Sequence, residues 1–239
     1  AALEARPFLI SISFGSPAPY VEALHQRGIR LATQVNTREE ALHAAQIGVD
    51  LIVAQGTEAG GHTGQVVTLP LLQLVLDAVQ VPVVAAGGIA TPRGVAAALA
   101  AGADGVWVGT CLLGSPECES TEQARSRIVQ TRETETILTS AFDIAQQLAW
   151  PSRYPGRALR NRFTEQWVAR TGELARNEAA RQQLAEAMRE KNYELAFIYA
   201  GEAVGLVEQQ RPAADVIRSL GDGAEQLLRT RGSVLLRDQ

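Results

Sequence analysis

The chain has 239 residues, of which 46% are hydrophobic and 20% charged, and its formal net charge is −4. This length and apolar content allow a substantial buried core, which excludes an intrinsically disordered chain. The mildly acidic balance is not that of a protein that binds nucleic acid or an anionic membrane, and no apolar run could span a bilayer. Two cysteines without metal-ligand spacing indicate a cytoplasmic protein with no metal site.

The first half of the chain alternates strand and helix patterns. Short apolar runs predict strands at 8–14, 29–35, 50–54, 81–86 and 105–108. A helix is predicted at 20–27, another after a capping box formed by Thr37 and Glu40, and a third from Thr91-Pro92 to Gly102. Strands joined by helices of this length form a parallel sheet through right-handed crossovers, so the predicted fold class is α/β.

The number of strands does not match a closed barrel. A (β/α)₈ barrel needs eight strands and the sequence indicates about five. The chain also opens on Ala1-Ala2-Leu3 without an initiator methionine, so we expect the first strands of a barrel to be absent from it. The barrel wall should then be open, or filled by a partner segment. The alternative is a smaller open sheet that is complete as it stands.

The composition changes after about residue 119. Strand signals stop, and the segments 121–148 and 173–199 are rich in the residues that favour helices. Between them, 150–157 contains two prolines and is predicted to be irregular. The stretch 213–231 predicts one more surface helix.

The densest chemical signal is the glycine-rich segment 55–64, which follows a buried strand and contains His62. Glycines let a backbone approach a flat or anionic group closely, and a histidine at a strand end suits proton transfer. The neighbours Gly60, Gly61 and Gly64 leave little bulk to hide the imidazole, so we expect it to face a cavity. The alternative is a tight turn with an incidental polar residue.

A second signal comes from two glycine turns that follow later strands. One contains Gly87 and Gly88, and the other contains Gly109 and Thr110. Free amide groups at such turns, near the start of a helix, form a cradle for an anion such as phosphate. The alternative is that the turns need glycine only for their geometry.

Other titratable residues are less informative. His25 and His43 lie among polar neighbours in predicted helices, which is typical of solvated surface positions. Cys111 follows a strand and is expected to pack as a small apolar residue. Cys118 lies between Glu117 and Glu119, whose charges disfavour a reactive thiolate.

These motifs carry a resemblance to a known family. The chain contains AQGTEAGGHTG, then VPVVAAGGIATPRGVAAALAAGADGVWVGT, and later Phe142-Asp143-Ile144, WPSRYPGRALRN and YAGEAVGL. In these runs it closely resembles the nitronate monooxygenases, formerly called 2-nitropropane dioxygenases. The resemblance implies a TIM (β/α)₈ barrel that binds FMN, here lacking its first strands, and a helical second domain. It also implies oxidation of alkyl nitronates by molecular oxygen to carbonyl compounds and nitrite.

The resemblance also assigns roles to residues. It makes His62 the catalytic base or substrate-orienting group, and it brings the segment from Tyr199 to Gly205 close to the flavin. Gln34 and Glu202 depart from the residues common in the family, so the substrate pocket differs in detail. The expected FMN-binding residues are Gln55, Gly60, Gly61, Gly87, Gly88, Trp107, Val108, Gly109 and Thr110.

The expected domains are a partial FMN-binding barrel over 1–118, a mainly helical substrate-side domain over 119–205, and a C-terminal helix over 206–239 that returns to the barrel. Two other functions stay open. A flavin-dependent enoyl-acyl-carrier-protein reductase shares the AGGH loop, although WPSRYPGRALRN looks more like the nitronate group. The other open possibility is a non-catalytic fragment or binding module. The expected partners are a small-molecule nitronate and oxygen, and the oligomeric state stays open between a monomer and a homodimer.

Overall fold

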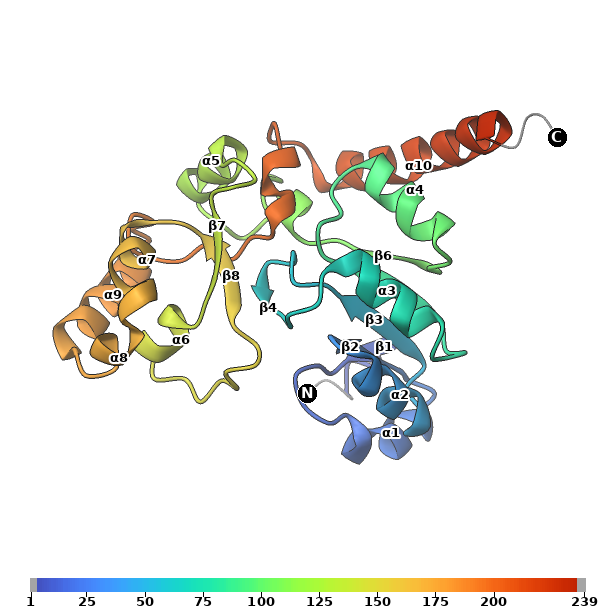
Figure 1. Cartoon of the computed structure of the whole chain (residues 1–239), viewed down its shortest axis with the longest axis horizontal. Coiled ribbons are helices and arrows are strands. Elements are labelled where there is room, and N and C mark those ends of the chain that lie inside the picture. Colours follow the sequence, from blue (N-terminus) through green and yellow to red (C-terminus); the bar gives the residue numbers. More distant parts are fainter. Residues whose placement is uncertain (1–3, 236–239) are drawn as a thin grey trace.

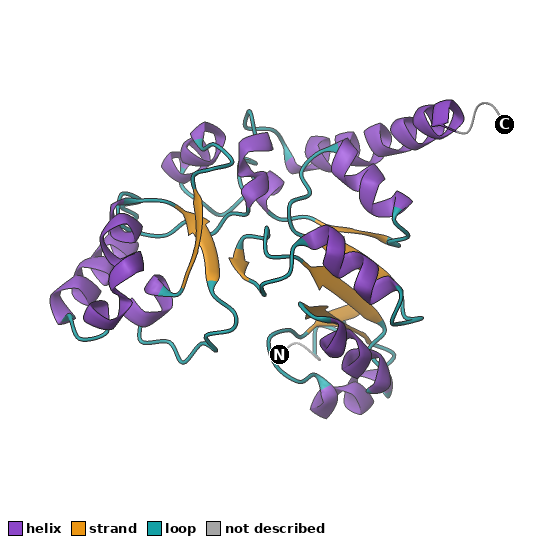
Figure 2. Ribbon diagram, viewed as in Figure 1, coloured by secondary structure: helices purple, strands orange, loops and turns teal. Residues whose placement is uncertain are grey.

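The computed structural model describes residues 4–235, which form two sheets flanked by helices (Figure 1, Figure 2). The first part contains β1 (Leu9–Ser11), α1 (Ala18–His25), β2 (Arg30–Val35), α2 (Arg38–Gln46), β3 (Leu51–Gln55), β4 (Gly61–His62), α3 (Thr68–Leu76), β5 (Val83–Ala86), α4 (Pro92–Ala100), β6 (Gly105–Trp107) and the 3₁₀ helix η1 (Thr110–Leu112). The second part contains α5 (Glu122–Gln130), β7 (Thr136–Thr139), α6 (Ala141–Ala145), β8 (Gly156–Leu159), α7 (Arg162–Trp167), η2 (Val168–Arg170), α8 (Thr171–Leu174), α9 (Glu178–Glu190), η3 (Glu202–Leu206) and α10 (Ala213–Leu235).

The larger sheet is parallel and has the order β1-β2-β3-β5-β6. Its strands are the five that the sequence predicts. They do not close on themselves, because β1 and β6 are the two edges of the sheet. Both edges are only partly covered, as the adjoining Phe8 is 71% exposed and Trp107 is 42% exposed. The expectation of an open barrel wall is therefore confirmed for the described residues.

Side-chain caps set the predicted helix starts. The hydroxyl oxygen of Thr37 accepts the amide of Glu40 at 3.2 Å, and the Glu40 carboxylate accepts the amide of Asn36 at 2.7 Å. Thr91 caps α4 in the same way, because its side chain accepts the amide of Gly94 at 3.3 Å. Each cap satisfies donors that the first helical turn leaves without partners. Thr37 and Thr91 are confirmed as caps, whereas the capping box is not formed as predicted, because Glu40 binds the amide of Asn36 rather than that of Thr37.

Two aspartates tie neighbouring strands together in a repeated arrangement. Asp50 precedes β3, and its carboxylate accepts the amide of Leu31 in β2 at 2.8 Å. Asp104 precedes β6 and accepts the amide of Val83 in β5 at 2.8 Å. The backbone amide of each aspartate returns a bond to the carbonyl of the same partner, so each pair exchanges two hydrogen bonds. This exchange fixes the register of the sheet at its amino-terminal edge, opposite the strand ends where the chemical residues lie.

The C-terminal part of the chain returns to the core of the parallel sheet. Leu31, Ile52 and Leu71 belong to the same buried cluster as Val204 and Leu220. Helix α10 runs along α4 and continues beyond it (Figure 1). The main core is therefore closed by residues more than 90 positions downstream of the sheet it covers.

The prediction that strands stop near residue 119 is wrong. β7 and β8 pair antiparallel with each other, and β8 also pairs with the two-residue β4, in the order β4-β8-β7. Gly156 and Arg157, predicted to be irregular, begin β8. All four residues of β8 are buried, and Arg157 is satisfied by groups from distant segments. Sequence alternation could not reveal such a strand, because its partners lie far away in the chain.

A second core lies beneath this small sheet. Phe142 and Phe163 stack with ring centroids 5.4 Å apart, and both are almost fully buried. The cluster also contains Ala158 from β8 and Leu184 from α9. Helices α6 to α9 thus share an apolar core that is separate from the one under the parallel sheet.

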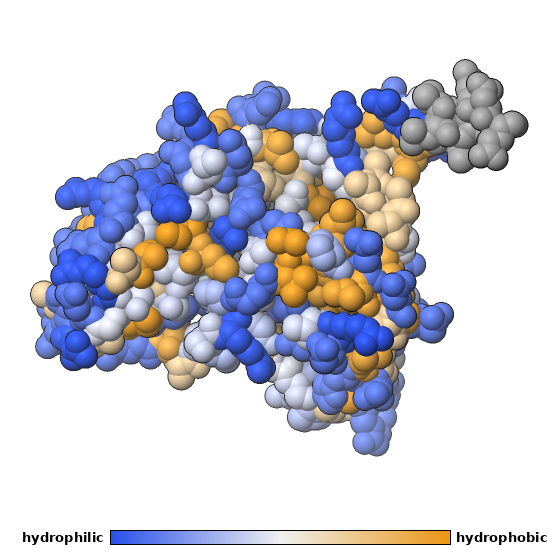
Figure 3. Space-filling model, in the orientation of Figure 1, coloured by the Kyte–Doolittle hydropathy of each residue, from blue (hydrophilic) through white to orange (hydrophobic). Residues whose placement is uncertain are grey.

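Apolar side chains also reach the surface. Orange residues gather over α3 in Figure 3, where Leu69 is 57% exposed and Leu74 is 45% exposed. None of the helices in residues 4–235 combines the length and apolar character that a membrane crossing requires.

The aspartate exchange predicts a stability effect. Asp104→Ala leaves the buried Val83 amide without its acceptor and should lower the free energy of unfolding by ~1–3 kcal/mol. Urea unfolding followed by circular dichroism measures the change. Asp77→Ala is the control, because Asp77 is exposed at the end of α3 and should shift the value by less than about 0.5 kcal/mol. Equal effects of the two substitutions would contradict the account.

Candidate functional site

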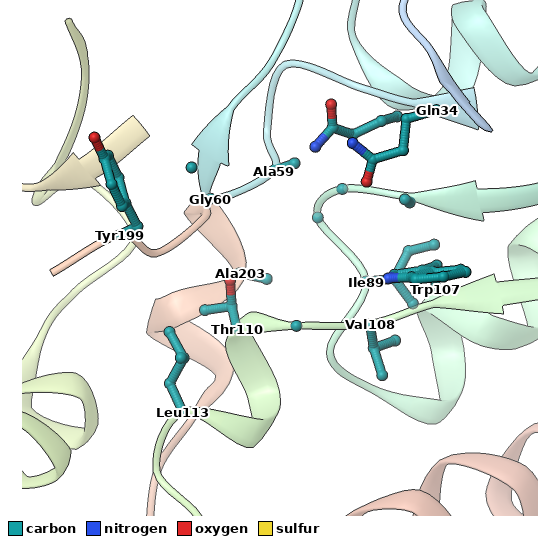
Figure 4. A pocket seen from close by; sticks show the side chains of 16 residues that line it. Gln34, Ala59, Gly60, Ile89, Trp107, Val108, Thr110, Leu113, Tyr199 and Ala203 are labelled. Atoms are coloured by element: carbon teal, nitrogen blue, oxygen red, sulfur yellow. The ribbon is translucent and has the colours of Figure 1, made fainter. Parts of the chain in front are cut away.

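A cleft of about 260 Å³ opens at the carboxyl ends of the parallel strands. Figure 4 shows Tyr199 on one side of it and Gln34 and Trp107 on the other. None of its lining residues carries a formal charge at neutral pH. The lining consists of Gln34, Gln55, Ala59, Gly60, Gly61, Ala86, Gly87, Gly88, Ile89, Trp107, Val108, Gly109, Thr110, Leu113, Tyr199 and Ala203. All nine residues expected to bind FMN are among them, as are Tyr199 and Ala203 from the segment expected to approach the flavin.

The two glycine turns face this one cleft. Gly88 has a φ of +70°, which turns the chain sharply before α4. Neither the Gly88 amide nor the Gly109 amide donates a hydrogen bond within the described residues. Thr110 accepts the amide of Gly201 at 2.9 Å, so its own hydroxyl proton remains to donate. The cleft therefore offers several neutral donors in one place, and the anion cradle stays a prediction that this arrangement supports.

A pair of buried amide side chains includes Gln55, which lines the cleft. The Asn36 amide donates to the backbone oxygen of Gln55 at 2.7 Å and to its side-chain oxygen at 3.1 Å. The Gln55 amide in turn donates to the backbone oxygen of His62 at 3.2 Å. Both side chains are more than 90% buried. The orientation of Gln55 is thus fixed at both ends before any ligand binds.

The glycine-rich segment packs directly on the segment that follows Tyr199. A Cβ on Gly60 would lie 2.6 Å from the backbone of Ala200 and Gly201. A Cβ on Gly201 would lie 2.4 Å from the carbonyl oxygen of Glu58. That same oxygen accepts the amide of Glu202 at 2.9 Å. Glycine is required at both positions because two backbones meet there, and this contact forms one wall of the cleft.

Glu58 anchors the other side of the glycine-rich segment. Its carboxylate accepts both the amide and the hydroxyl of Thr68, at 2.9 Å each. Thr68 begins α3, so the carboxylate also lies at the positive end of the helix dipole. The Glu58 carboxylate is therefore engaged in structural hydrogen bonds and is not available as an acid or base in the cleft.

His62 does not line the cleft, and the expectation that it would face the cavity was wrong. Its Nε2 lies 2.9 Å from Oδ1 of Asp143, and its ring stacks on Trp150 with centroids 3.9 Å apart. The Tyr199 ring, which is part of the cleft lining, lies 5.7 Å from the His62 ring. The adjacent glycines do leave room, but Trp150 and Asp143 fill it from distant parts of the chain.

Tyr199 is the residue shared by the cleft and the histidine cluster. Burial raises the pKa of its phenol, and the nearby charge of Asp143 raises that pKa further. The phenol therefore stays protonated at neutral pH. The phenol can donate a hydrogen bond but cannot serve as a base.

Several of these residues were missed by sequence reasoning. Asp143 lies in the quoted FDI motif and Trp150 begins WPSRYPGRALRN, but neither motif indicates a contact with His62. Arg157 is also buried, where it donates to the Thr57 carbonyl at 2.9 Å and pairs with Glu202 at 2.9 Å. Only the fold brings these groups together. Glu202, noted as a departure from the family, thus neutralises a buried arginine.

The remaining titratable residues follow the expectations in part. His43 is exposed, as predicted. His25 is also at the surface, but its Nε2 lies 2.8 Å from Asp50, so it is not merely solvated. Cys111 is buried in the main core, and burial raises the pKa of its thiol. The prediction that Cys111 packs as a small apolar residue is confirmed.

Comparisons with known proteins agree with this architecture. The family model for nitronate monooxygenase matches residues 1–223. A nitronate monooxygenase of Neurospora crassa is 35% identical over 227 residues, which cover 90% of this chain and 59% of that protein. Among solved structures, FabK from Thermotoga maritima superposes with a TM-score of 0.83 at 28% identity, covering 97% of this chain and 73% of that chain. The nitroalkane oxidase from Streptomyces ansochromogenes gives a TM-score of 0.77 at 27% identity, covering 91% of this chain and 64% of that chain.

The fold and the cleft at its strand ends define an α/β protein of the TIM-barrel type, in which the described sheet is an open, curled part of the barrel. The chain belongs to the nitronate monooxygenase family. It spans about three-fifths of the length of the curated relatives first matched. The resemblance drawn from the glycine motifs is thereby confirmed.

The backbone contact at Gly60 predicts a second stability effect. Gly60→Ala must push apart the two backbones that form the cleft wall, and should cost ~1–3 kcal/mol of unfolding free energy. Gly172→Ala is the matched control, because a Cβ there meets open space in an exposed helix and should not destabilise the protein. Thermal unfolding of both variants checks this. A Gly60→Ala protein as stable as the Gly172→Ala protein would refute the close contact.

Proposed function

We propose that this chain is an FMN-dependent oxidoreductase that oxidises alkyl nitronates with molecular oxygen to a carbonyl compound and nitrite. The observation that carries the proposal is the cleft, which unites both glycine turns with a fixed amide face. The cleft lies at the carboxyl ends of parallel strands, where barrel enzymes have their active sites. Family membership and the likeness to a nitroalkane oxidase support the same activity.

The lining supplies the kinds of group that FMN would need. The phosphate would be held by the amides of Gly88 and Gly109 and by the Thr110 hydroxyl, which have no other acceptor for their protons. The flat ring would lie against the backbone at Gly60 and beside Gln55. Bound flavin supplies the redox chemistry, and the protein supplies orientation and electrostatics.

His62 would act on a substrate that reaches it beside Tyr199, at the edge of the cleft. A neutral imidazole can take the proton alpha to a nitro group, and the charged form can hold an anionic nitronate. Both roles are compatible with a histidine ring that stacks on Trp150 and lies beside Tyr199. The protonated phenol of Tyr199 would donate to the nitro or nitronate oxygen from its place in the cleft lining.

The second candidate is a flavin-dependent enoyl-acyl-carrier-protein reductase. The structural likeness to FabK favours it, with a TM-score of 0.83. Against it stands the segment WPSRYPGRALRN, whose first residue packs on His62. Anaerobic mixing with NADPH separates the two, because rapid bleaching of the flavin would indicate the reductase. A protein that binds no flavin at all would indicate a non-catalytic binding module.

The phosphate cradle can be tested by comparing FMN with riboflavin, which lacks the phosphate. Gly109→Asp places a negative charge in open space at the cleft and should weaken FMN binding at least tenfold, about 1.4 kcal/mol. Riboflavin binding should change little, because no phosphate is repelled. Flavin fluorescence titration measures both affinities, with Gly172→Asp as a control. Equal loss for both flavins, or for neither, would argue against the cradle.

Substitution of His62 tests the reaction. His62→Ala should retain FMN, because the cradle is elsewhere, and should lower turnover of a neutral nitroalkane by ~10²–10⁴ if the imidazole is a general base. Turnover of the preformed nitronate should fall less in that case, and comparably if the role is electrostatic. Oxygen consumption with each substrate gives the two rates. The role fails if the variant keeps its flavin and oxidises both substrates at the unsubstituted rate.

A further inference from the structure

His62 is positioned by the smaller sheet rather than by the barrel strand that precedes it. Its backbone forms β4 and pairs with Gly156 in β8, and the Thr63 amide donates to the Pro155 carbonyl at 3.2 Å. The ring is then covered by Trp150 from the same connection. The second part of the chain therefore fixes both the position and the orientation of the imidazole ring.

The contact between Asp143 and His62 determines which ring nitrogen is available. Oδ1 of Asp143 lies 2.9 Å from Nε2 of His62, and the two side chains are only 5% and 15% exposed. An ionised carboxylate can only accept hydrogen bonds, so Nε2 must carry a proton for this contact to be favourable. In the neutral ring the other nitrogen, Nδ1, then keeps its lone pair.

No other described group around the ring forms a hydrogen bond that would favour protonation of Nδ1 instead. The Tyr199 ring lies 5.7 Å away with a phenol that stays protonated, and Phe14 and Trp150 contact the imidazole through their rings without a hydrogen bond to it. Among the described residues, Asp143 is the charged group in hydrogen-bond contact with the imidazole. A carboxylate in this position both orients the ring and stabilises the imidazolium once a proton has been taken.

We propose that Asp143 is a positioning residue, which holds His62 as the Nε2–H tautomer and makes Nδ1 the proton acceptor. The consequence for catalysis rests on the proposed function, whereas the tautomer does not. In the proton-transfer step, Nδ1 takes the proton from the carbon alpha to the nitro group. The electron pair of that C–H bond becomes the C=N π bond of the nitronate, and the N=O π pair moves onto the nitro oxygen. The new imidazolium charge lies beside the Asp143 carboxylate.

The chain contains its own matched comparison. His25 and Asp50 form the same kind of pair, with Nε2 2.8 Å from Oδ2, but their side chains are 41% and 32% exposed. Water can replace Asp50 as a partner for His25, whereas little water can reach His62. The tautomer should therefore be strongly fixed at His62 and less strongly fixed at His25.

Long-range ¹⁵N–¹H correlation spectra of the histidine-labelled chain test the tautomer without added flavin. His25→Gln and His43→Gln assign the signals of the three imidazoles. We expect His62 in the unsubstituted protein, at a pH where it is neutral, to show a protonated Nε2 and an unprotonated Nδ1. Asp143→Asn should lose this preference, because an asparagine amide can also donate to Nε2. Asp50→Asn should alter only the His25 signals.

The unsubstituted spectrum is decisive even if Asp143→Asn does not fold, because it needs no variant. A protonated Nδ1 on neutral His62 would overturn the proposal, as would an unchanged tautomer in folded Asp143→Asn protein.

Turnover tests the catalytic consequence separately. With FMN bound, Asp143→Asn should lower turnover of a neutral nitroalkane by about 10²-fold or more, in the range that general-base catalysis contributes, and lower turnover of the preformed nitronate less. An equal loss for both substrates would contradict a role in proton transfer. Failure of the unsubstituted chain to bind FMN or oxidise nitronate would refute the proposed function, whereas the spectra would still decide the tautomer.

Discussion

The backbone contact between the glycine-rich segment and residues 200–202 is the constraint on which the rest of the site depends. It brings Gly60 and Gly201 so close that no side chain fits between them. Through it, the Thr110 hydroxyl is oriented by Gly201, and the segment carrying Tyr199 becomes a wall of the cleft. The parallel sheet and the helices beside the small sheet have separate cores, and this contact joins the glycine-rich segment to residues 200–202 at the cleft.

Charge is distributed around the cleft rather than within it. The lining residues are neutral, whereas the nearby ionisable groups are occupied by defined partners: Glu58 by Thr68, Arg157 by Glu202, and Asp143 by His62. Buried charges of this kind are tolerated when each has a partner, and they fix the geometry of the segments that carry them. An anionic ligand would therefore be recognised by backbone amides and a hydroxyl, whose positions are set before it binds.

Local patterns were sufficient to predict the parallel sheet and much of the cleft. The five strands, the caps at Thr37 and Thr91, and the glycine turns are encoded in residues close together in the sequence, so the sequence alone reveals them. The small sheet was missed because β8 is stabilised by distant groups, such as the Thr57 carbonyl that Arg157 binds. The environment of His62 was missed for the same reason, since Asp143 and Trp150 reach it through the fold and no local pattern predicts their contact.

One flavin-binding cleft is formed jointly by the turns after the parallel strands and by residues 199–203. Hydrogen–deuterium exchange with and without FMN tests it most directly, because it reports each segment separately. The account predicts that FMN slows exchange together in 55–64, 87–91, 108–111 and 199–203, although the last of these belongs to the part of the chain beyond the parallel sheet. Protection confined to the segments that follow the parallel strands, or absent from all four segments, would contradict a site to which residues 199–203 also contribute.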